Sequence, residues 1–263
     1  MKNNKGNILK QKLATAFIGF ILLLLWLELS KYTVYSLVIP AVFLGFISWN
    51  SYTYAKAKKI CLGKCYFSES SLFYYFWTRK TYIFIVALFI GLLLTASLVF
   101  ASFTFNSIDI GILFLDTFML VYLYTFLENS KTFNAKVKRP ILKNITAWVN
   151  SIFLVTVFFI IALYQTPPEY IQADLKSTLD FLNEKNYSKS QLIDTLAYAS
   201  SVMVATKWWL VSKAEFLLEN ESLKKVIWFL QLMGSYMMVF AYSRFILEIV
   251  TTFTIQNEEN GRE

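Results

Sequence analysis

The stretch DIGILFLDTFMLVYLY, from Asp109 to Tyr124, places one carboxylate, Asp116, inside a long apolar run. The run extends from Ile108 to Leu127, which matches the roughly 20 apolar residues that a helix needs to cross about 30 Å of hydrocarbon. A helix also satisfies all of its backbone hydrogen bonds internally, as lipid requires. The stretch therefore predicts a transmembrane helix, and Asp116 is the residue in it that needs an explanation.

The whole chain has the same apolar character. It contains 263 residues, of which 57% are hydrophobic and only 16% are charged, and its mean hydropathy is +0.50. Soluble domains carry about 25% charged residues. A transmembrane β-barrel would show alternating strands of about ten residues, whereas runs such as Ile83 to Phe103 are continuous. We therefore expect an all-α polytopic membrane protein.

Six runs are long and apolar enough to be transmembrane helices. They are Leu13 to Leu29, Tyr32 to Tyr54, Tyr82 to Thr104, Ile108 to Leu127, Ile145 to Tyr164 and Val226 to Phe253. The apolar core of the first run is followed by Trp26, Glu28 and Leu29 rather than by a small-residue cleavage site, so we expect an anchored span and not a cleaved signal peptide. Three parts result: a membrane domain of five spans (1–165), an extracytoplasmic helical loop (166–225), and the last span with a cytoplasmic tail (226–263).

The distribution of lysine and arginine predicts the orientation. Basic residues gather before the first span, between the second and third spans, and between the fourth and fifth. These segments share one side of the membrane, which the positive-inside bias makes cytoplasmic. Tryptophans, which prefer the membrane boundary, fall at or near span ends: Trp26, Trp49, Trp77, Trp148 and Trp228. We expect a multi-pass protein of the cell inner (plasma) membrane with a cytoplasmic N-terminus.

The long connection contains two helical patterns. In TPPEYIQADLKSTLDFL, a capping box at Thr166 and Glu169, with Pro167 at the first helical position, predicts an amphipathic helix on the outer surface. A second pattern has a short core from Leu196 to Thr206, rich in Ala and Ser, which favours an interfacial or re-entrant segment over a span. A seventh span here, which would place the C-terminus outside, is the alternative.

Three ionisable residues lie deep within the predicted spans: Asp116, Arg244 and Glu248. Each costs about 3 kcal/mol at mid-span on insertion scales, so each is expected to face protein or water rather than lipid. Asp109 lies seven residues before Asp116 on the same helical face, and the two acids could line a cation or proton path. The structural alternative, which we favour, is a protonated Asp116 that hydrogen-bonds to a neighbouring helix.

Arg244 and Glu248 are four residues apart on the last span and can pair along the helix. Arg244 could also reach Asp116 on another helix. A structural pairing or snorkelling role is the favoured interpretation for Arg244. The candidate intramembrane polar site therefore consists of Asp109, Asp116, Arg244 and Glu248.

Recognised chemical motifs are missing from the sequence. It has no histidine, which excludes an HExxH metal site and Ser-His or Cys-His pairs, and it has no GxxxxGK[ST] phosphate loop. Cys61 and Cys65 lie on the cytoplasmic side and are expected to be free thiols without a metal. We expect a protein that is not an enzyme, with no cofactor and no metal.

The positive charge has an ordinary explanation. The formal net charge is +8, and much of it lies in basic segments beside spans, such as Ala55 to Lys80. Juxtamembrane lysines set topology and attract acidic lipid headgroups, so nucleic-acid binding is not needed. The lipid bilayer is the expected partner, together with a second copy of the chain or another protein.

These observations lead to three functional hypotheses. The leading one is a non-enzymatic inner-membrane protein that acts by assembling with itself or a partner, as a sensor, effector or scaffold of a bacterial accessory system such as phage defence or immunity. Its lysine-rich, Asn-, Ile- and Phe-rich composition fits an AT-rich accessory gene. The alternatives are an ion or proton channel along the acidic stripe and a small-solute transporter. A transporter is disfavoured because Pro40 is the only proline within a predicted span.

Overall fold

The computed structural model describes residues 2–66, 71–72, 79–130, 138–164, 171, 174–217 and 221–260. Every regular element within these ranges is a helix. The elements are α1 (Lys2–Leu29), the 3-10 helix η1 (Val34–Leu37), α2 (Val38–Tyr66), α4 (Lys80–Ser102), α5 (Ser107–Asn129), α6 (Lys138–Tyr164), α7 (Leu175–Asn183), α8 (Gln191–Leu217) and α9 (Glu221–Asn260).

Six segments of the described residues are long and apolar enough to cross a membrane. They are Ile8–Leu29, Val34–Lys59, Lys80–Ser102, Ser107–Asn129, Arg139–Ile161 and Ser235–Thr254. Each overlaps one of the six predicted spans, so the predicted all-α polytopic membrane fold is confirmed. The fifth segment begins before the predicted start at Ile145, and the sixth lies well inside α9, which itself begins before Val226.

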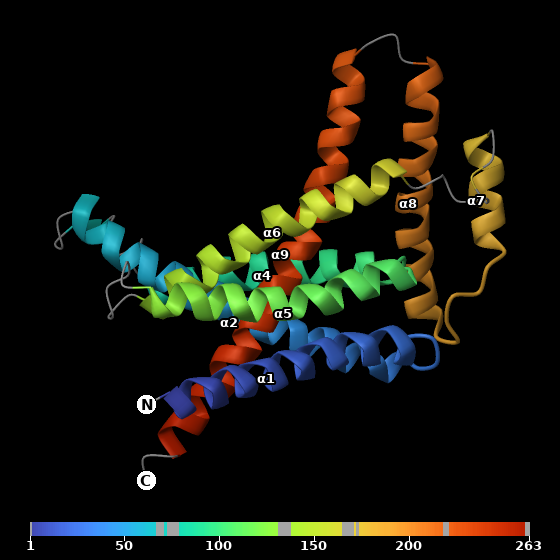
Figure 1. Cartoon of the computed structure of the whole chain (residues 1–263). Helices are drawn as coiled ribbons and strands as arrows, with labels where there is room; N and C mark the ends of the chain where they lie inside the picture. Colours follow the sequence, from blue (N-terminus) through green and yellow to red (C-terminus); the bar gives the residue numbers. More distant parts are fainter. Residues whose placement is uncertain are drawn as a thin grey trace.

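The last helix forms the centre of the bundle. In Figure 1, α1, α2, α5 and α6 run broadly along one direction, and α9 crosses them obliquely. Helix α9 contacts α1, α2, α4, α5 and α6. Every side chain from Met238 to Thr251 is buried. A helix that is buried on all sides needs no polar face, which explains why α9 shows no amphipathic pattern.

Side-chain contacts show which helix ends lie next to each other in the bundle. Lys12 near the start of α1 forms an ion pair with Glu128 near the end of α5. At the other end of the bundle, the indole Nε1 of Trp26 donates a hydrogen bond to Ser102 Oγ at 2.8 Å, which joins α1 to α4. The start of α1 and the end of α9 lie at one end of the bundle in Figure 1, which we call the N-terminal end.

Helices α2 and α4 pack closely because of one glycine. They form the most extensive helix pair in the described part of the chain. A Cβ atom placed on Gly91 would lie only 2.0 Å from Ser48 Oγ and 3.0 Å from Ser48 Cα. Small residues that let two backbones approach closely are a common basis of helix association in lipid.

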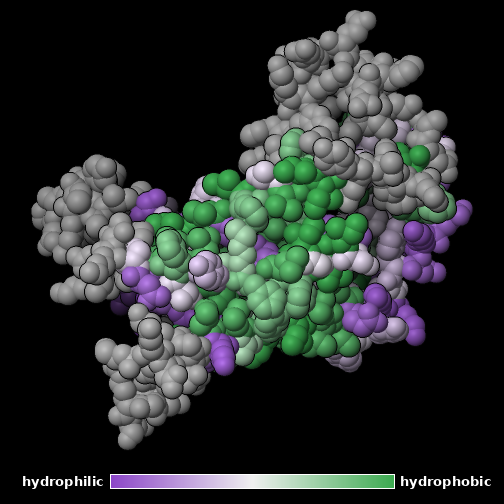
Figure 2. Space-filling model, viewed as in Figure 1, coloured by the Kyte–Doolittle hydropathy of each residue, from purple (hydrophilic) through white to green (hydrophobic). Residues whose placement is uncertain are grey.

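The bundle surface has an apolar belt between polar ends. Figure 2 shows apolar residues over the middle of the molecule and hydrophilic residues at two opposite ends of the same face. Large exposed side chains on the candidate spans include Ile85 and Phe89 of α4 and Leu115 and Tyr122 of α5. An exposed belt of this kind is expected where lipid covers the protein.

The long connection between α6 and α9 differs in part from the sequence prediction. Helix α7 begins at Leu175, with Asp174 Oδ2 accepting a hydrogen bond from Ser177 N at 3.3 Å as its N-cap. Ile171 is not helical, so one continuous helix from Thr166 to Leu182 is wrong. The predicted capping box at Thr166, Pro167 and Glu169 lies outside the described residues.

Helix α8 is a single helix that crosses the end of the bundle. In Figure 1 it stands steeply inclined to α1 and α5, at the end opposite the N-terminal end. Ser200 Oγ donates to the carbonyl of Phe100, close to the end of α4. The chain before α8 is tied to the turn after α1, since Ser188 Oγ donates to the Ser30 carbonyl and Lys189 N donates to the Lys31 carbonyl.

Candidate functional site

The candidate site is a column of buried polar side chains between α2, α5, α6 and α9. Its members share burial and hydrogen bonding to another helix or to each other. They are Asn50, Ser51, Asp116, Lys143, Asn144, Asn150, Ser243, Arg244 and Glu248, which we call the polar column. Polar groups at this depth are satisfied by protein because lipid offers them no partner.

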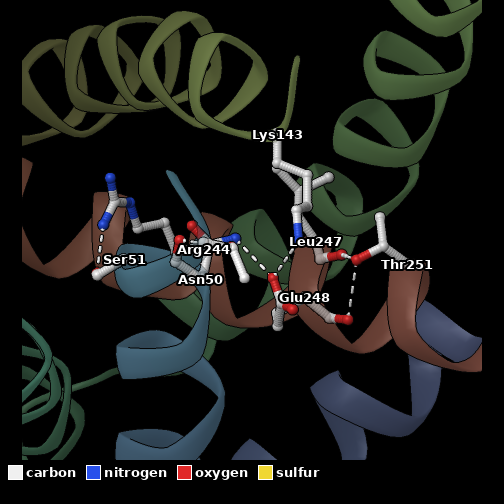
Figure 3. Close-up of polar contacts among 8 residues, drawn as sticks. Asn50, Ser51, Lys143, Arg244, Leu247, Glu248 and Thr251 are labelled. Atoms are coloured by element: carbon white, nitrogen blue, oxygen red, sulfur yellow. Dashed lines mark hydrogen bonds and ion pairs between the residues drawn. The ribbon is translucent and has the colours of Figure 1, made fainter. Parts of the chain in front are cut away.

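An ion pair lies in the part of the column nearest the N-terminal end. Lys143 Nζ is 2.6 Å from Glu248 Oε2, and the two side chains are only 9% and 3% exposed. The same carboxylate oxygen accepts a hydrogen bond from Asn50 Nδ2 at 2.8 Å (Figure 3). Three helices, α2, α6 and α9, thus meet at one carboxylate.

Arg244 lies about one turn from Glu248 on α9, and its hydrogen-bond partners among the described residues are neutral. Its Nη1 donates to Ser51 Oγ at 2.6 Å, and its Nη2 donates to Asn144 Oδ1. Its guanidinium carbon also lies 4.5 Å from the centre of the Phe240 ring. The planar guanidinium presents several donors in fixed directions, which suits simultaneous contacts with α2 and α6.

Asp116 is the member of the column on α5. Asn150 Nδ2 of α6 donates to Asp116 Oδ2 at 3.0 Å and also to Ser243 Oγ of α9 at 3.0 Å. One residue further along α5, the hydroxyls of Thr117 and Tyr242 lie 2.6 Å apart, and Tyr242 donates to the Leu113 carbonyl at 2.9 Å. This cluster joins α5, α6 and α9 in the interior of the bundle.

The column occupies one half of the bundle. Along α6, Lys143 and Asn144 come first and Asn150 follows by almost two turns, whereas α9 passes the same levels in reverse, from Ser243 to Glu248. Beyond Asp116, toward the end covered by α8, buried apolar residues follow on all three helices: Leu113, Leu154 and Val239. The polar groups therefore reach from the N-terminal end to the interior and stop there.

The structure brings together three of the four residues that the sequence singled out. Asp116, Arg244 and Glu248 are all buried in the column. Asp109 is not part of it, because it completes a capping box with Asn106 at the start of α5: Asn106 Oδ1 accepts from Asp109 N at 2.8 Å, and Asp109 Oδ2 accepts from Asn106 N at 2.9 Å.

The predicted pairings within the site are corrected. Neither Glu248 nor Asp116 is a hydrogen-bonding or ion-pairing partner of Arg244 in the described part of the chain. Glu248 instead meets a lysine from another helix. The reason is that a helical period shows which face a residue occupies but does not show what the neighbouring helix offers to that face.

Five partners were missed by the sequence argument, among them Ser51 of α2, which lay within a predicted span. Lys143 and Asn144 were assigned to a cytoplasmic loop, but α6 begins at Lys138 and buries both. Asn50 and Asn150 lay within predicted spans and were not singled out. The sequence did contain a signal for Lys143 and Asn150, because these polar residues are seven positions apart and therefore lie on the same face of α6.

Outside the column, Lys207 of α8 lies near Asp109. Burial lowers the pKa of the Lys207 amine, and the neighbouring Asp109 carboxylate partly opposes this effect. This electrostatic interaction is between α8 and the start of α5, and neither residue is part of the polar column.

The chemistry that the described column offers is hydrogen bonding and charge pairing. Among the described residues, no group of three or more His, Cys, Asp or Glu side chains is arranged to hold a metal ion. The side chains of Cys61 and Cys65 lie outside the described part. No protein-family model, curated protein or solved structure matches the chain.

Proposed function

We propose that this protein is a non-enzymatic component of a bacterial inner membrane that acts by assembling with itself or with a protein partner. In this role it serves as a sensor, effector or scaffold of an accessory system, for which phage defence or immunity is the class suggested by composition. The polar column supports this proposal because each charge in it is bound by another helix. Such side chains hold a bundle together and leave its outer surface to recognise partners.

The observation that carries the proposal is the position of α8 and the first part of α9. In Figure 1, these two helices form a hairpin that extends past the other spans. The small residues Ala197, Ser200 and Ala205 on α8 are buried within the chain itself, so the opposite side of α8 is the surface available to a partner. Met203 lies on that side and is 63% exposed.

A pair of single-cysteine variants tests this proposal. Cys61 and Cys65 are replaced by Ser, and Met203→Cys is then introduced alone. The control is Phe89→Cys on α4, because Phe89 is 64% exposed and lies in the apolar belt. Oxidation in native membranes is expected to give a crosslinked product for Met203→Cys and not for Phe89→Cys. A monomer in native mass spectrometry, together with no adduct at position 203, would overturn the proposal.

A proton or ion channel is the second candidate, and one observation favours it. The polar column reaches from the N-terminal end to Asp116, so an ion could approach Asp116 from that side. The layer of Leu113, Leu154 and Val239 would then have to open for passage. Flux measured in liposomes should fall when Asp116 is replaced by Asn if this candidate is right; unchanged flux removes it.

A further inference from the structure

Two buried oxygen atoms in the polar column have no hydrogen-bond partner. They are Asp116 Oδ1 and Asn150 Oδ1, each with almost no exposed surface. Both belong to side chains that are already joined, because Asn150 Nδ2 donates to the other oxygen of Asp116, Oδ2, at 3.0 Å. Unpaired polar atoms are costly in a buried site, so this coincidence on one pair of side chains needs a chemical explanation.

The protonation state of Asp116 supplies that explanation. An ionised carboxylate has two acceptor oxygens and no donor, so it can offer nothing to the amide oxygen of Asn150. A carboxylic acid has one donor and one acceptor, as has the facing edge of a carboxamide. A single proton on Asp116 Oδ1 would be donated to Asn150 Oδ1 and would satisfy both unpaired atoms in one reciprocal pair.

The charged groups around Asp116 also indicate that its side chain carries a proton. Ion pairs between described residues include Lys12 with Glu128, Lys31 with Glu28 and Lys143 with Glu248, and Asp116 takes part in none of these three. Helix α6 presents Asn150 to it, and α9 presents Ser243 and Tyr242, all neutral.

The buried cations of the described residues are already engaged. Arg244 of α9 binds Ser51 and Asn144, Lys143 of α6 binds Glu248, and Lys12 of α1 binds Glu128. An ionised Asp116 would therefore be a buried charge without a cation in contact, and such a group neutralises itself by taking up a proton.

We propose that Asp116 is a proton-binding site, in which its carboxylic acid and the Asn150 carboxamide share the proton and join α5 to α6. Release of the proton would turn the two oxygens into facing acceptors and break one of the two bonds between these helices. The site therefore links the proton occupancy of Asp116 to the contact between α5 and α6. This inference holds whether or not the protein assembles as proposed above.

Infrared spectroscopy of the protein in lipid tests the assignment. A carbonyl band from a protonated carboxyl group is expected at neutral pH, and it should shift when aspartate is labelled with ¹³C at its carboxyl carbon. The band should disappear in Asp116→Asn and move to higher frequency in Asn150→Ala, where the amide donor to Oδ2 is lost. The control Glu28→Gln alters an exposed carboxylate and should leave the band unchanged.

Melting temperature provides an independent readout. Asn at position 116 reproduces both bonds of the acid–amide pair without a proton, so Asp116→Asn should melt within about a degree of the wild type. Asp116→Leu, which has a similar size but forms no hydrogen bond, should melt several degrees lower. The absence of a label-sensitive protonated carboxyl band in the wild type would overturn the proposal, even if no variant folds.

Discussion

The Lys143–Glu248 ion pair joins two helices, α6 and α9, within the polar column. Both side chains are almost fully buried, and Asn50 donates a further hydrogen bond to the same carboxylate. For a buried pair, the loss of water by both ions offsets much of their attraction, so the pair as a whole adds little to stability. Removing one partner is different, because it leaves the other charge buried and alone.

The substitution Glu248→Gln tests this asymmetry. It leaves the Lys143 ammonium without its counter-charge, and we expect the free energy of unfolding to fall by about 3–5 kcal/mol. The double variant Lys143→Met with Glu248→Gln removes both charges and should recover most of that loss. Thermal unfolding in detergent or nanodiscs measures both effects.

Glu28→Gln is the matched control for this prediction. Glu28 and Lys31 form an ion pair of similar length, 2.7 Å, but their side chains are 59% and 56% exposed. Exposed pairs contribute little to stability because water and salt screen them, so this variant should unfold close to the wild-type temperature. Equal effects of Glu28→Gln and Glu248→Gln would show that the column pair is not buried as described.

At the scale of elements, the contact between α2 and α4 depends on the absence of a side chain at Gly91. Gly91→Ala would place its Cβ atom 2.0 Å from Ser48 Oγ, so the helices would have to separate. Overpacking of this kind typically costs about 1–3 kcal/mol. We expect a lower unfolding temperature for Gly91→Ala and partial recovery when Ser48→Gly is added.

Gly45→Ala on α2 is the control for this prediction. A Cβ atom at Gly45 would meet nothing within 4 Å. Alanine is favoured over glycine inside a helix by about 1 kcal/mol, so this variant should be as stable as the wild type or more stable. The two Gly→Ala substitutions are therefore predicted to change stability in opposite directions. A loss of stability in both variants would contradict the packing described for α2 and α4.

The start of α8 is held by one carboxylate. Asp194 Oδ1 accepts hydrogen bonds from Tyr187 N at 2.6 Å and from Ser188 N at 3.0 Å. Asp194→Ala would free both amides, and we expect faster hydrogen exchange in residues 185–190 as a result. Asp180→Ala on α7 is the control, and faster exchange at 185–190 in that variant would argue against a specific role of Asp194.

The helices could be predicted from sequence more readily than their partners. Apolar length located all six spans, because the hydrocarbon thickness fixes how long an apolar helix must be. The depth of Asp116, Arg244 and Glu248 also predicted that they would be buried. Lys143 and Asn144, the partners of Glu248 and Arg244, were missed. A basic residue near the end of a span was interpreted as marking the cytoplasmic side of the membrane. The rotation of each helix about its axis, which decides the pairing, is a property of the packed bundle.

At the scale of the whole molecule, the number of transmembrane spans determines on which side of the membrane the C-terminus lies. The start of α1 and the end of α9 lie at the same end of the bundle, and α8 is not among the helices apolar enough to cross a membrane. A C-terminal green fluorescent protein fusion should therefore be fluorescent, and a C-terminal alkaline phosphatase fusion should be inactive. The reverse pattern would support seven spans.

The orientation of the bundle in the membrane is tested separately, by labelling a single cysteine. The positive-inside bias predicts that the N-terminal end of the bundle faces the cytosol. Met203→Cys on α8, in a background without Cys61 and Cys65, should then react with a membrane-impermeant maleimide added to intact spheroplasts. Labelling only after the membrane has been broken would contradict this orientation.

The central position of α9 has a consequence for biogenesis. It is synthesised after the other five spans of the described residues, yet it contacts all five of them. Until it inserts, Lys143, Asn50 and Asn150 lack their partners from α9, and Arg244 and Glu248 disfavour insertion of α9 by itself. The earlier helices then lack the helix that contacts all of them, and a chain truncated at Lys225 is expected to be degraded rather than to accumulate.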